Sequence, residues 1–370
     1  MNDFALSEED TDLKVPILNQ IKSVLESENR NLSLIGALWS APSWMKSTDL
    51  QDSGNIVAEP KYFETLNNYL AKYVEAYKNM GFNFWGISPL NEPIVGITGD
   101  SGFPNTAWFP AYFSRFIYET MAPYFLKNHP EINILISETG RTATPFYVAC
   151  MADYRNAHGY NLTNTTFPNV NYYGMHFNGF DTPNFWTRIG ELQGVDFHPV
   201  TTEAMYEISS KHSAKDYLGS WSAAEAYAVN LVFDLNGNST IYADWNMMLN
   251  QNGGPSWVGK YATSATYSDP DDNDVFYKNP IFYVQGHFSK LIKNGWNKRG
   301  SKSDGHGTVL AKPGIMLSVM ESPDMTKRVA VMVNRYSSDQ EVNYWDRDLK
   351  SEVNLVVPAY SVTSVYYSLV

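Results

Sequence analysis

Cysteine is almost absent from this chain of 370 residues, which contains one thiol, Cys150. A lone thiol supports neither an intrachain disulfide nor a cysteine-based metal site. No run of apolar residues reaches the ~18 to 20 that a membrane-spanning helix requires. Basic residues are also scarce, because 27 Lys and Arg stand against 39 Asp and Glu, giving a formal net charge of -12. A nucleic-acid backbone is therefore not an expected partner.

Apolar and aromatic residues, in contrast, are plentiful. Hydrophobic residues make up 44% of the sequence and aromatic residues 15%. This content fills the core of a large domain and leaves enough for a small second one. The aromatic residues suit a large α/β core, and they equally suit stacking on the faces of sugar rings. The composition is that of a globular chain.

The first 295 residues alternate between strand and helix patterns. Every connection is long enough to be a crossover, so the strands should form a parallel sheet, and at this length the usual result is a (β/α)8 TIM-type barrel. A closed barrel needs eight units, but only six strands are present. We therefore expect strands three to eight of a barrel in residues 1–295, with the first two βα units absent. The predicted strands span residues 32–38, 83–88, 132–137, 170–175, 198–204 and 240–243.

From residue 296 to residue 370 the pattern changes to short strands of alternating residues. Turns containing Gly, Pro, Asp and Asn separate these strands. The pattern predicts a small C-terminal antiparallel β-sandwich domain. Its predicted strands span residues 307–311, 315–320, 327–334, 352–357 and 361–367.

Two glutamates stand where predicted barrel strands end. Glu92 follows the strand 83–88 in the sequence Asn91-Glu92-Pro93, and Glu203 lies at the end of the strand 198–204. A lone glutamate before proline is often a solvated loop residue. Two carboxylates on strand ends of one barrel, however, could face each other across a pocket, which is the minimum equipment for glycoside hydrolysis.

His176 leaves a second chemistry open. It ends the strand 170–175 and, together with Glu92 and Glu203, could form a metal site of one His and two carboxylates. A metal-dependent hydrolase is therefore an alternative. No second His with ligand spacing stands on a neighbouring strand end, and a hydrogen-bonded pocket His that orients a carboxylate is the favoured interpretation of this position. We predict no metal and no organic cofactor.

Seven short segments of the sequence form a recognisable series. They are residues 4–11 (FALSEEDT), 39–46 (WSAPSWMK), 91–93 (NEP), 202–204 (TEA), 244–246 (DWN), 252–257 (NGGPSW) and 286–290 (GHFSK). In this order they resemble segments of glycoside hydrolase family 30, most closely of its acid β-glucosidase or glucosylceramidase branch. The resemblance covers essentially the whole chain, and it is specific because the segments follow one another in the family's order.

The resemblance implies a retaining β-glycosidase without a cofactor. Glu92 would be the general acid/base and Glu203 the nucleophile, two roles that require different protonation states at the start of the reaction. Asn91 would donate to the sugar 2-hydroxyl. The remaining residues predicted to bind the substrate are Trp39 and Trp245, which would wall the glucose site, and Arg141, His176 and Asn246.

The same resemblance implies a biological setting. The expected substrate is glucosylceramide or a related β-glucoside, with a lipid surface or an activator protein as possible partners, in a lysosomal or secreted protein. A β-1,6-glucanase, a β-xylosidase or an inactive truncated sugar-binding remnant are the alternatives. Four glycosylation sequons, at Asn31, Asn161, Asn164 and Asn238, count only in a secretory protein.

The sequence also departs from the branch. Asn178 stands where the branch has a Tyr, Tyr261 replaces an Asn, and the loop 94–103 differs. If the strand 83–88 is strand four, strands one and two and a sugar-binding Asp precede residue 1. A sheet open at that edge exposes unpaired backbone groups, so we expect residues 1–370 alone to be poorly soluble and weakly active.

Overall fold

The structure is a computed structural model that describes most of the chain. The described residues are 4–98, 102–160, 167–177, 197–206, 208, 214–256, 258–259, 261–272, 274–303 and 314–369. The predicted strand 307–311, the sequons at Asn161 and Asn164, and Asn178 lie outside these ranges.

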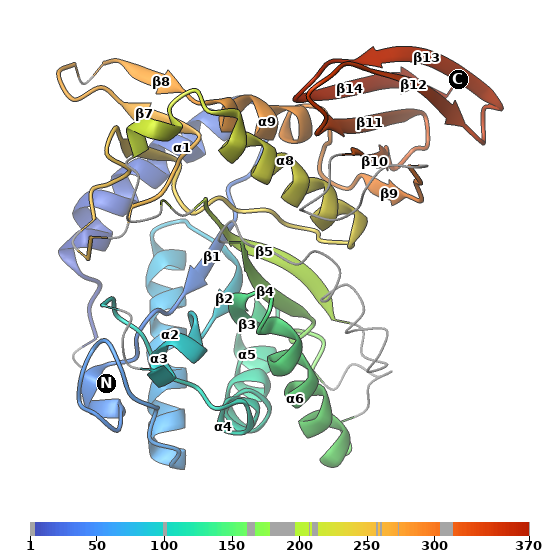
Figure 1. The fold of residues 1–370 in the computed structure, drawn as a ribbon. Helices are drawn as coiled ribbons and strands as arrows, with labels where there is room; N and C mark the ends of the chain where they lie inside the picture. The colour runs from blue at the N-terminus through green and yellow to red at the C-terminus, as the bar shows by residue number, and fades with distance from the viewer. Residues whose placement is uncertain are drawn as a thin grey trace. The chain divides into compact units, whose positions relative to one another are not determined.

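A curled parallel sheet of five strands, half of a barrel, carries the predicted strand ends (Figure 1). The strands follow one another in space as in sequence, from β1 to β5, as successive βα units require. Their bounds are β1 Leu34–Ala37, β2 Phe84–Ser88, β3 Asn133–Gly140, β4 Tyr172–Phe177 and β5 His198–Ala204. The predicted sixth strand, 240–243, runs parallel beside β5 through one bridge, between Thr201 and Tyr242. The predicted barrel fold is thereby confirmed.

The helices of the N-terminal half form where the sequence places an apolar stripe or a cap. In α2, side chains spaced three or four residues apart are buried on one face, and the helix ends two residues before Gly81, whose φ of 85° suits glycine. Before η1, Ser7 and Asp10 exchange hydrogen bonds in the manner of a capping box: each backbone amide donates to the other side chain. The bounds are η1 Glu9–Lys14, α1 Val15–Ser27, η2 Ser43–Met45, α2 Pro60–Asn79, α3 Pro93–Thr98, α4 Pro110–Phe116, η3 Ile117–Met121, α5 Ala122–Asn128 and α6 Thr144–Ala157.

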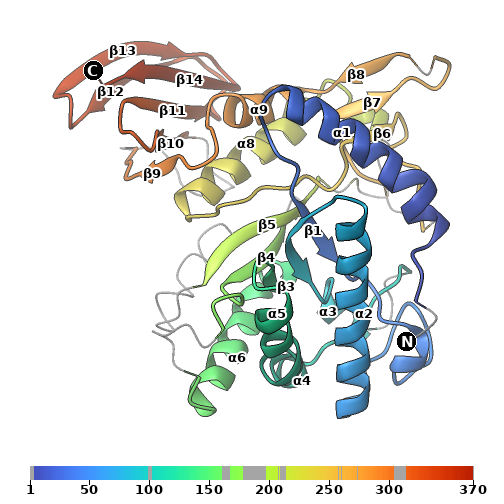
Figure 2. The same ribbon diagram turned by 180° about the vertical axis from the view of Figure 1, so that it is seen from behind.

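The C-terminal half combines two helices, α8 and α9, with an antiparallel sheet, an antiparallel hairpin and a small mixed sheet (Figure 2). One sheet has the order β14-β11-β10-β9, β12 and β13 form a hairpin, and β6, β7 and β8 form a small third sheet. The predicted antiparallel β domain is confirmed. The bounds are η5 Ala214–Tyr217, α8 Trp221–Asn236, β6 Met248–Asn250, β7 Thr266–Ser268, β8 Phe276–Lys278, α9 Pro280–Ser289, β9 Asn297–Arg299, β10 Ile315–Glu321, β11 Lys327–Asn334, β12 Gln340–Asp346, β13 Ser351–Val357 and β14 Ser361–Ser368.

Strand β11 is buried on both faces, as its unbroken apolar run requires. Val329, Val331 and Val333 pack into the core that contains α8 and α9. The alternate residues, Ala330 and Met332, pack into a separate core beneath the β12–β13 hairpin. The two-residue period of a strand thus supplies two hydrophobic cores at once.

The chain divides into two compact units. One comprises Met1–Gly174 with Ile189–His198, and the other comprises Met175–Arg188 with Pro199–Val370. The predicted domain boundary between residues 295 and 296 falls within the second unit and stays a prediction.

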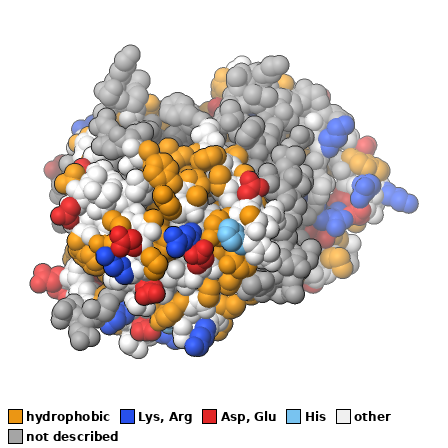
Figure 3. All heavy atoms as spheres, turned by 90° about the horizontal axis from the view of Figure 1, so that it is seen from below, with side chains coloured by type: hydrophobic (Ala, Val, Ile, Leu, Met, Phe, Trp, Pro, Cys, Tyr) orange, Lys and Arg blue, Asp and Glu red, His pale blue; other side chains and the backbone are white. Residues whose placement is uncertain are grey.

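None of the described helices is both long and apolar enough to span a bilayer. On the face in Figure 3, acidic and basic side chains are interspersed among hydrophobic ones, so the negative charge is not concentrated there.

Candidate active site

The segment after β2 holds Asn91 and Glu92 in a bent backbone. Asn91 is buried, and Glu92 has a φ of 40°, a left-handed conformation that is uncommon for a residue with a side chain. Hydrogen bonds fix this bend, because the Glu92 amide donates to the Glu138 carbonyl at 2.8 Å and the Asn105 side-chain amide donates to the Glu92 carbonyl at 3.1 Å. The main chain at the predicted acid/base is therefore held from two sides.

The end of β3 supplies a carboxylate that the sequence interpretation missed. Ser137 and Glu138 have φ values of 82° and 37°, and the Glu138 side chain is buried, as is that of the predicted substrate residue Arg141. Glu138 lies against Gly174 of β4: a Cβ atom at Gly174 would be 2.3 Å from the Glu138 carboxyl carbon. The signal was present, because Glu138 ends an apolar strand just as Glu92 does.

Replacing Gly174 with alanine should displace Glu138, since the added methyl group overlaps the carboxyl group. We expect a loss of about 1 to 3 kcal/mol in the free energy of unfolding, as for other overpacked sites. Urea denaturation measures this loss. Gly140→Ala is the matched control, because no atom lies within 4 Å of its added Cβ. Equal stability of the two variants would contradict the packing described.

Trp39, predicted to wall the sugar site, is half-buried and meets the ring of Phe103 edge-on at 5.6 Å. The buried ammonium group of Lys46 fixes the adjoining loop by donating to the Ser40 hydroxyl and to the carbonyls of Gln51 and Asn105, at 2.8 to 2.9 Å. Burial lowers the pKa of Lys46 to about 8. Since the Asn105 side chain also binds the Glu92 carbonyl, one network supports both predicted site segments.

In the second unit, the structure brings together His176 and Glu203. The His176 Nδ1 atom lies 3.9 Å from Glu203 Oε1, with the imidazole buried and the carboxylate mostly buried. Their strands are joined by the Met205 amide, which donates to the Phe177 carbonyl at 2.8 Å. This geometry agrees with the interpretation of His176 as a residue that orients a carboxylate.

The segment 244–246 reaches the end of β5 through backbone hydrogen bonds. The backbone amide of Trp245 donates to the carbonyl of Ala204, the residue after Glu203, at 2.9 Å, and the indole is partly exposed. Asn246 is half-buried, and its carbonyl accepts from the Ser264 hydroxyl at 3.0 Å.

The carboxylate of Asp244 fixes the segment 244–246 through hydrogen bonds. It accepts hydrogen bonds from the Tyr227 hydroxyl at 2.9 Å, from the Gln285 amide at 2.7 Å and from the Trp245 amide at 3.0 Å. Burial nevertheless raises the pKa of Asp244 to about 6. The sequence interpretation gave Asp244 no role, because its burial depends on Tyr227 and Gln285, which are distant in sequence.

Asp244→Asn should change how stability depends on pH. The folded pKa of about 6 lies above the ordinary 3.8, so folding takes up a proton and the wild type gains stability as pH falls from about 6 to about 4. Asparagine carries no charge. Its side-chain amide can donate to the Gln285 side-chain oxygen if the Gln285 amide group rotates by 180°. We expect the variant to be more stable at pH 7 by about 2 kcal/mol and the difference to vanish near pH 4.

Chemical denaturation across this pH range measures the effect. Asp153→Asn, at an exposed position on α6, is the control and should follow the wild type. A constant difference between Asp244→Asn and the wild type at all pH values would show that Asp244 is not buried as described.

A comparison with family profiles decides the family of the chain. The profile described as "Glycosyl hydrolase family 30 TIM-barrel domain" matches residues 1–292. The chain belongs to glycoside hydrolase family 30. Its family 30 membership makes it a glycoside hydrolase and confirms the resemblance that the seven sequence segments indicate.

Curated relatives agree with this family. The lysosomal acid glucosylceramidase of Mus musculus is 28% identical over 98% of this chain and 67% of its own length. The putative glucosylceramidase 3 of Caenorhabditis elegans is 26% identical over 98% of this chain and 66% of its own length. The endo-1,6-beta-D-glucanase neg1 of Aspergillus fumigatus is 22% identical over 86% of this chain and 62% of its own length. The chain thus spans about two thirds of the relatives it matches.

Solved structures share the family 30 fold. SrfJ from Salmonella typhimurium superimposes with a TM-score of 0.79 at 17% identity, covering 99% of this chain and 74% of SrfJ. A family 30 subfamily 8 xylanase from Clostridium acetobutylicum gives a TM-score of 0.64 at 16% identity, covering 98% of this chain and 87% of the xylanase. The roles assigned to individual site residues stay predictions.

Proposed function

We propose that the protein is a retaining β-glucosidase in which Glu92 is the general acid/base and Glu203 the nucleophile. The observation that carries this proposal is their position at the carboxyl ends of β2 and β5, strands of one parallel sheet. In barrels of this type, catalytic groups come from the carboxyl ends of the strands. Retention requires the two carboxyl groups to act about 5 Å apart.

In the proposed reaction, Glu92 protonates the glycosidic oxygen while Glu203 attacks the anomeric carbon. The alcohol leaves, and a covalent glycosyl ester forms on Glu203. Glu92 then takes a proton from water, which attacks the same carbon and releases the sugar with its original configuration. The buried imidazole of His176 lies 3.9 Å from the Glu203 carboxylate, and this proximity of a polar ring supports the proposed role of Glu203.

The proposed substrate is glucosylceramide or a related β-glucoside. The relatives named as glucosylceramidases support it, since they match 98% of the chain at 26 to 28% identity. Asn91 would bind the 2-hydroxyl, with Arg141 and Asn246 as further polar contacts. Trp39 and Trp245 would wall the site, and their partial exposure leaves ring surface available for a sugar face.

A β-1,6-glucan is the second candidate substrate, favoured by the Aspergillus fumigatus relative named as an endo-1,6-beta-D-glucanase. Initial rates on glucosylceramide in detergent micelles, on a linear β-1,6-glucan and on aryl β-xylosides separate the possibilities. We expect kcat/KM for glucosylceramide to exceed the others at least tenfold. A preference for the glucan or the xyloside would overturn the proposed substrate, and inactivity on all three would favour the sugar-binding remnant.

We further propose a lysosomal or secreted protein that acts at a lipid surface, alone or with an activator protein. Asn31 and Asn238, the sequon residues within the described chain, are both exposed, so either site can accept a glycan. Expression through a secretory pathway followed by mass spectrometry of the two tryptic peptides tests this. Unmodified asparagine at both positions would count against the proposed location.

Activity should survive prolonged treatment with a strong chelator. The proposed roles use both glutamates for covalent and proton-transfer chemistry, and a carboxylate that forms a glycosyl ester or transfers a proton cannot serve as a metal ligand at the same time. The enzyme is dialysed against the chelator, and its hydrolytic activity is then measured with and without added zinc or manganese. Loss of activity that either metal restores would favour the metal-dependent hydrolase.

A further inference from the structure

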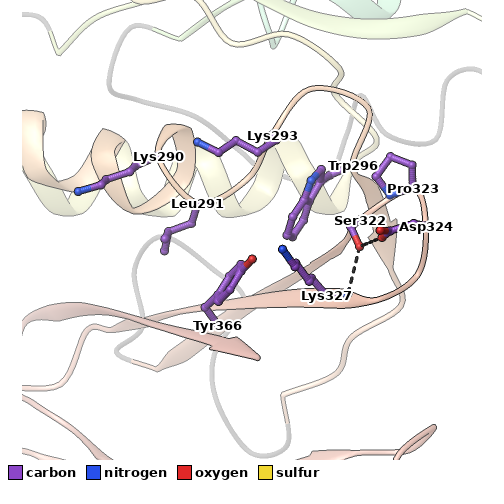
Figure 4. A pocket seen from close by; sticks show the side chains of 9 residues that line it. All are labelled: Lys290, Leu291, Lys293, Trp296, Ser322, Pro323, Asp324, Lys327 and Tyr366. Atoms are coloured by element: carbon purple, nitrogen blue, oxygen red, sulfur yellow. Dashed lines mark hydrogen bonds between the residues drawn. The ribbon is translucent and has the colours of Figure 1, made fainter. Parts of the chain in front are cut away.

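A pocket of about 600 Å³ lies in the second unit, between the end of α9 and the sheet β14-β11-β10-β9 (Figure 4). None of the residues that line it belongs to the candidate active site. Its volume is within the range of pockets that bind small molecules. The lining residues are Lys290, Leu291, Lys293, Trp296, Ser322, Pro323, Asp324, Lys327 and Tyr366.

The register of the sheet explains why these side chains converge. Lys327 of β11 pairs with Ser368 of β14, so Tyr366, two residues earlier on β14, points to the same face. Trp296 directly precedes β9, whose first residue, Asn297, pairs with Glu321 at the end of β10. The indole therefore lies beside the turn that joins β10 to β11.

Two aromatic rings form one wall of the pocket. The rings of Trp296 and Tyr366 are stacked, with centroids 6.4 Å apart and planes 26° apart. Tyr366 is 49% exposed, so a large part of its ring is open to a ligand. Stacked, partly exposed rings offer the flat apolar surface on which the C–H face of a sugar ring packs.

Three lysines line the same pocket, and in Figure 4 the ammonium group of Lys327 lies beside the two rings, whereas that of Lys290 points away from them. Lys290, Lys293 and Lys327 are all exposed, and none forms an ion pair within the described residues. One carboxylate, Asp324, also lines the pocket, but it accepts hydrogen bonds from the Ser322 hydroxyl and from Thr326. The lining therefore carries three lysines and one hydrogen-bonded aspartate. This gives the pocket a local positive charge, although the net charge of the chain is -12.

We propose that this pocket binds an anionic sugar, a hexose ring that carries a phosphate or sulfate monoester. The lysines supply charge-assisted hydrogen bonds to the ester oxygens, and Trp296 and Tyr366 supply the surface for the ring. A neutral sugar leaves the three positive charges unmatched, and an inorganic anion leaves the aromatic wall uncovered. The pocket is a sugar site separate from the candidate active site, and the proposal does not rest on the assignment of Glu92 and Glu203.

Isothermal titration calorimetry with glucose 6-phosphate and glucose 6-sulfate tests the proposal on the full chain. We expect saturable binding of both esters, at least tenfold tighter than that of glucose or of inorganic phosphate. The double variant Lys293→Met with Lys327→Met should weaken binding at least tenfold, and Trp296→Ala should also weaken it. Lys350→Met, an exposed lysine outside the pocket, and Trp245→Ala, in the candidate active site, should each stay within twofold of the wild type.

Three results would overturn the proposal. The first is inorganic phosphate that binds as tightly as the sugar esters, which would indicate a simple anion site. The second is binding that Trp245→Ala abolishes and the lysine variants do not, which would place the ligand in the candidate active site. The third is failure to bind either ester at 10 mM combined with binding to phosphatidylserine vesicles, which would assign the pocket to a lipid headgroup.

Discussion

Replacing Glu203 with glutamine will abolish hydrolysis of an aryl β-glucoside, with a loss in kcat of at least about 10⁴-fold, the scale on which removal of a covalent nucleophile acts. Glutamine keeps the size of the side chain but cannot form the glycosyl ester, because an amide is a very weak nucleophile. A 2-fluoro glucosyl inactivator should label Glu203 in the wild type and leave the variant unlabelled. Peptide mapping by mass spectrometry locates the label.

The matched control is Glu341→Gln on the exposed strand β12, which should keep full activity. Circular dichroism of the Glu203→Gln variant should match that of the wild type, because glutamine has nearly the same size and shape as glutamate beside the buried imidazole of His176. Label on a different carboxylate, or turnover by Glu203→Gln near the wild-type rate, would show that Glu203 is not the nucleophile.

Glu92→Ala should slow the hydrolysis of a substrate more strongly when its leaving group requires protonation. For a natural alkyl leaving group we expect a loss of about 10² to 10⁴-fold in kcat, the usual contribution of general acid–base catalysis. For an activated aryl glucoside, formation of the glycosyl-enzyme should be affected less, because that leaving group departs without a proton. Azide, which needs no general base, should then accelerate turnover and yield β-glucosyl azide, detectable by NMR.

Glu64→Gln, at an exposed position on α2, serves as the control and should show neither the loss nor the azide effect. An α-configured azide product would mean inversion instead of retention. A Glu92→Ala enzyme that azide leaves unchanged would remove Glu92 from the acid/base role.

The strand ends were predictable because their signal is local. An apolar run followed by a polar tip marks β2 and β5, and the same rule places Glu92 and Glu203 at the carboxyl edge of the sheet. Glu138, near the carboxyl end of β3, follows the same rule. Its importance, however, depends on a close approach to Gly174, and a contact between residues 36 positions apart leaves no local pattern in a single sequence.

Helix α1 shows a second limit of sequence patterns. The four-residue spacing of its apolar side chains predicts an amphipathic helix, and the helix is present. Yet Ile17 is 53% exposed, and no residue of α1 is buried. Periodicity predicts which face of a helix is apolar. It does not predict whether that face is buried, because burial depends on residues distant in sequence.

Strand β11 has a consequence for how the second unit opens. It is hydrogen-bonded along its whole length to β10 on one side and β14 on the other, and its side chains belong to two separate hydrophobic cores. An amide proton of β11 can exchange with solvent only when its hydrogen bond breaks. Breaking the strand away from its neighbours exposes the side chains of both hydrophobic cores, so exchange requires that both cores unfold. Hydrogen exchange at Val329 to Val333 therefore reports the full free energy of unfolding of this unit, whereas exchange in the exposed β12–β13 hairpin reports only local opening.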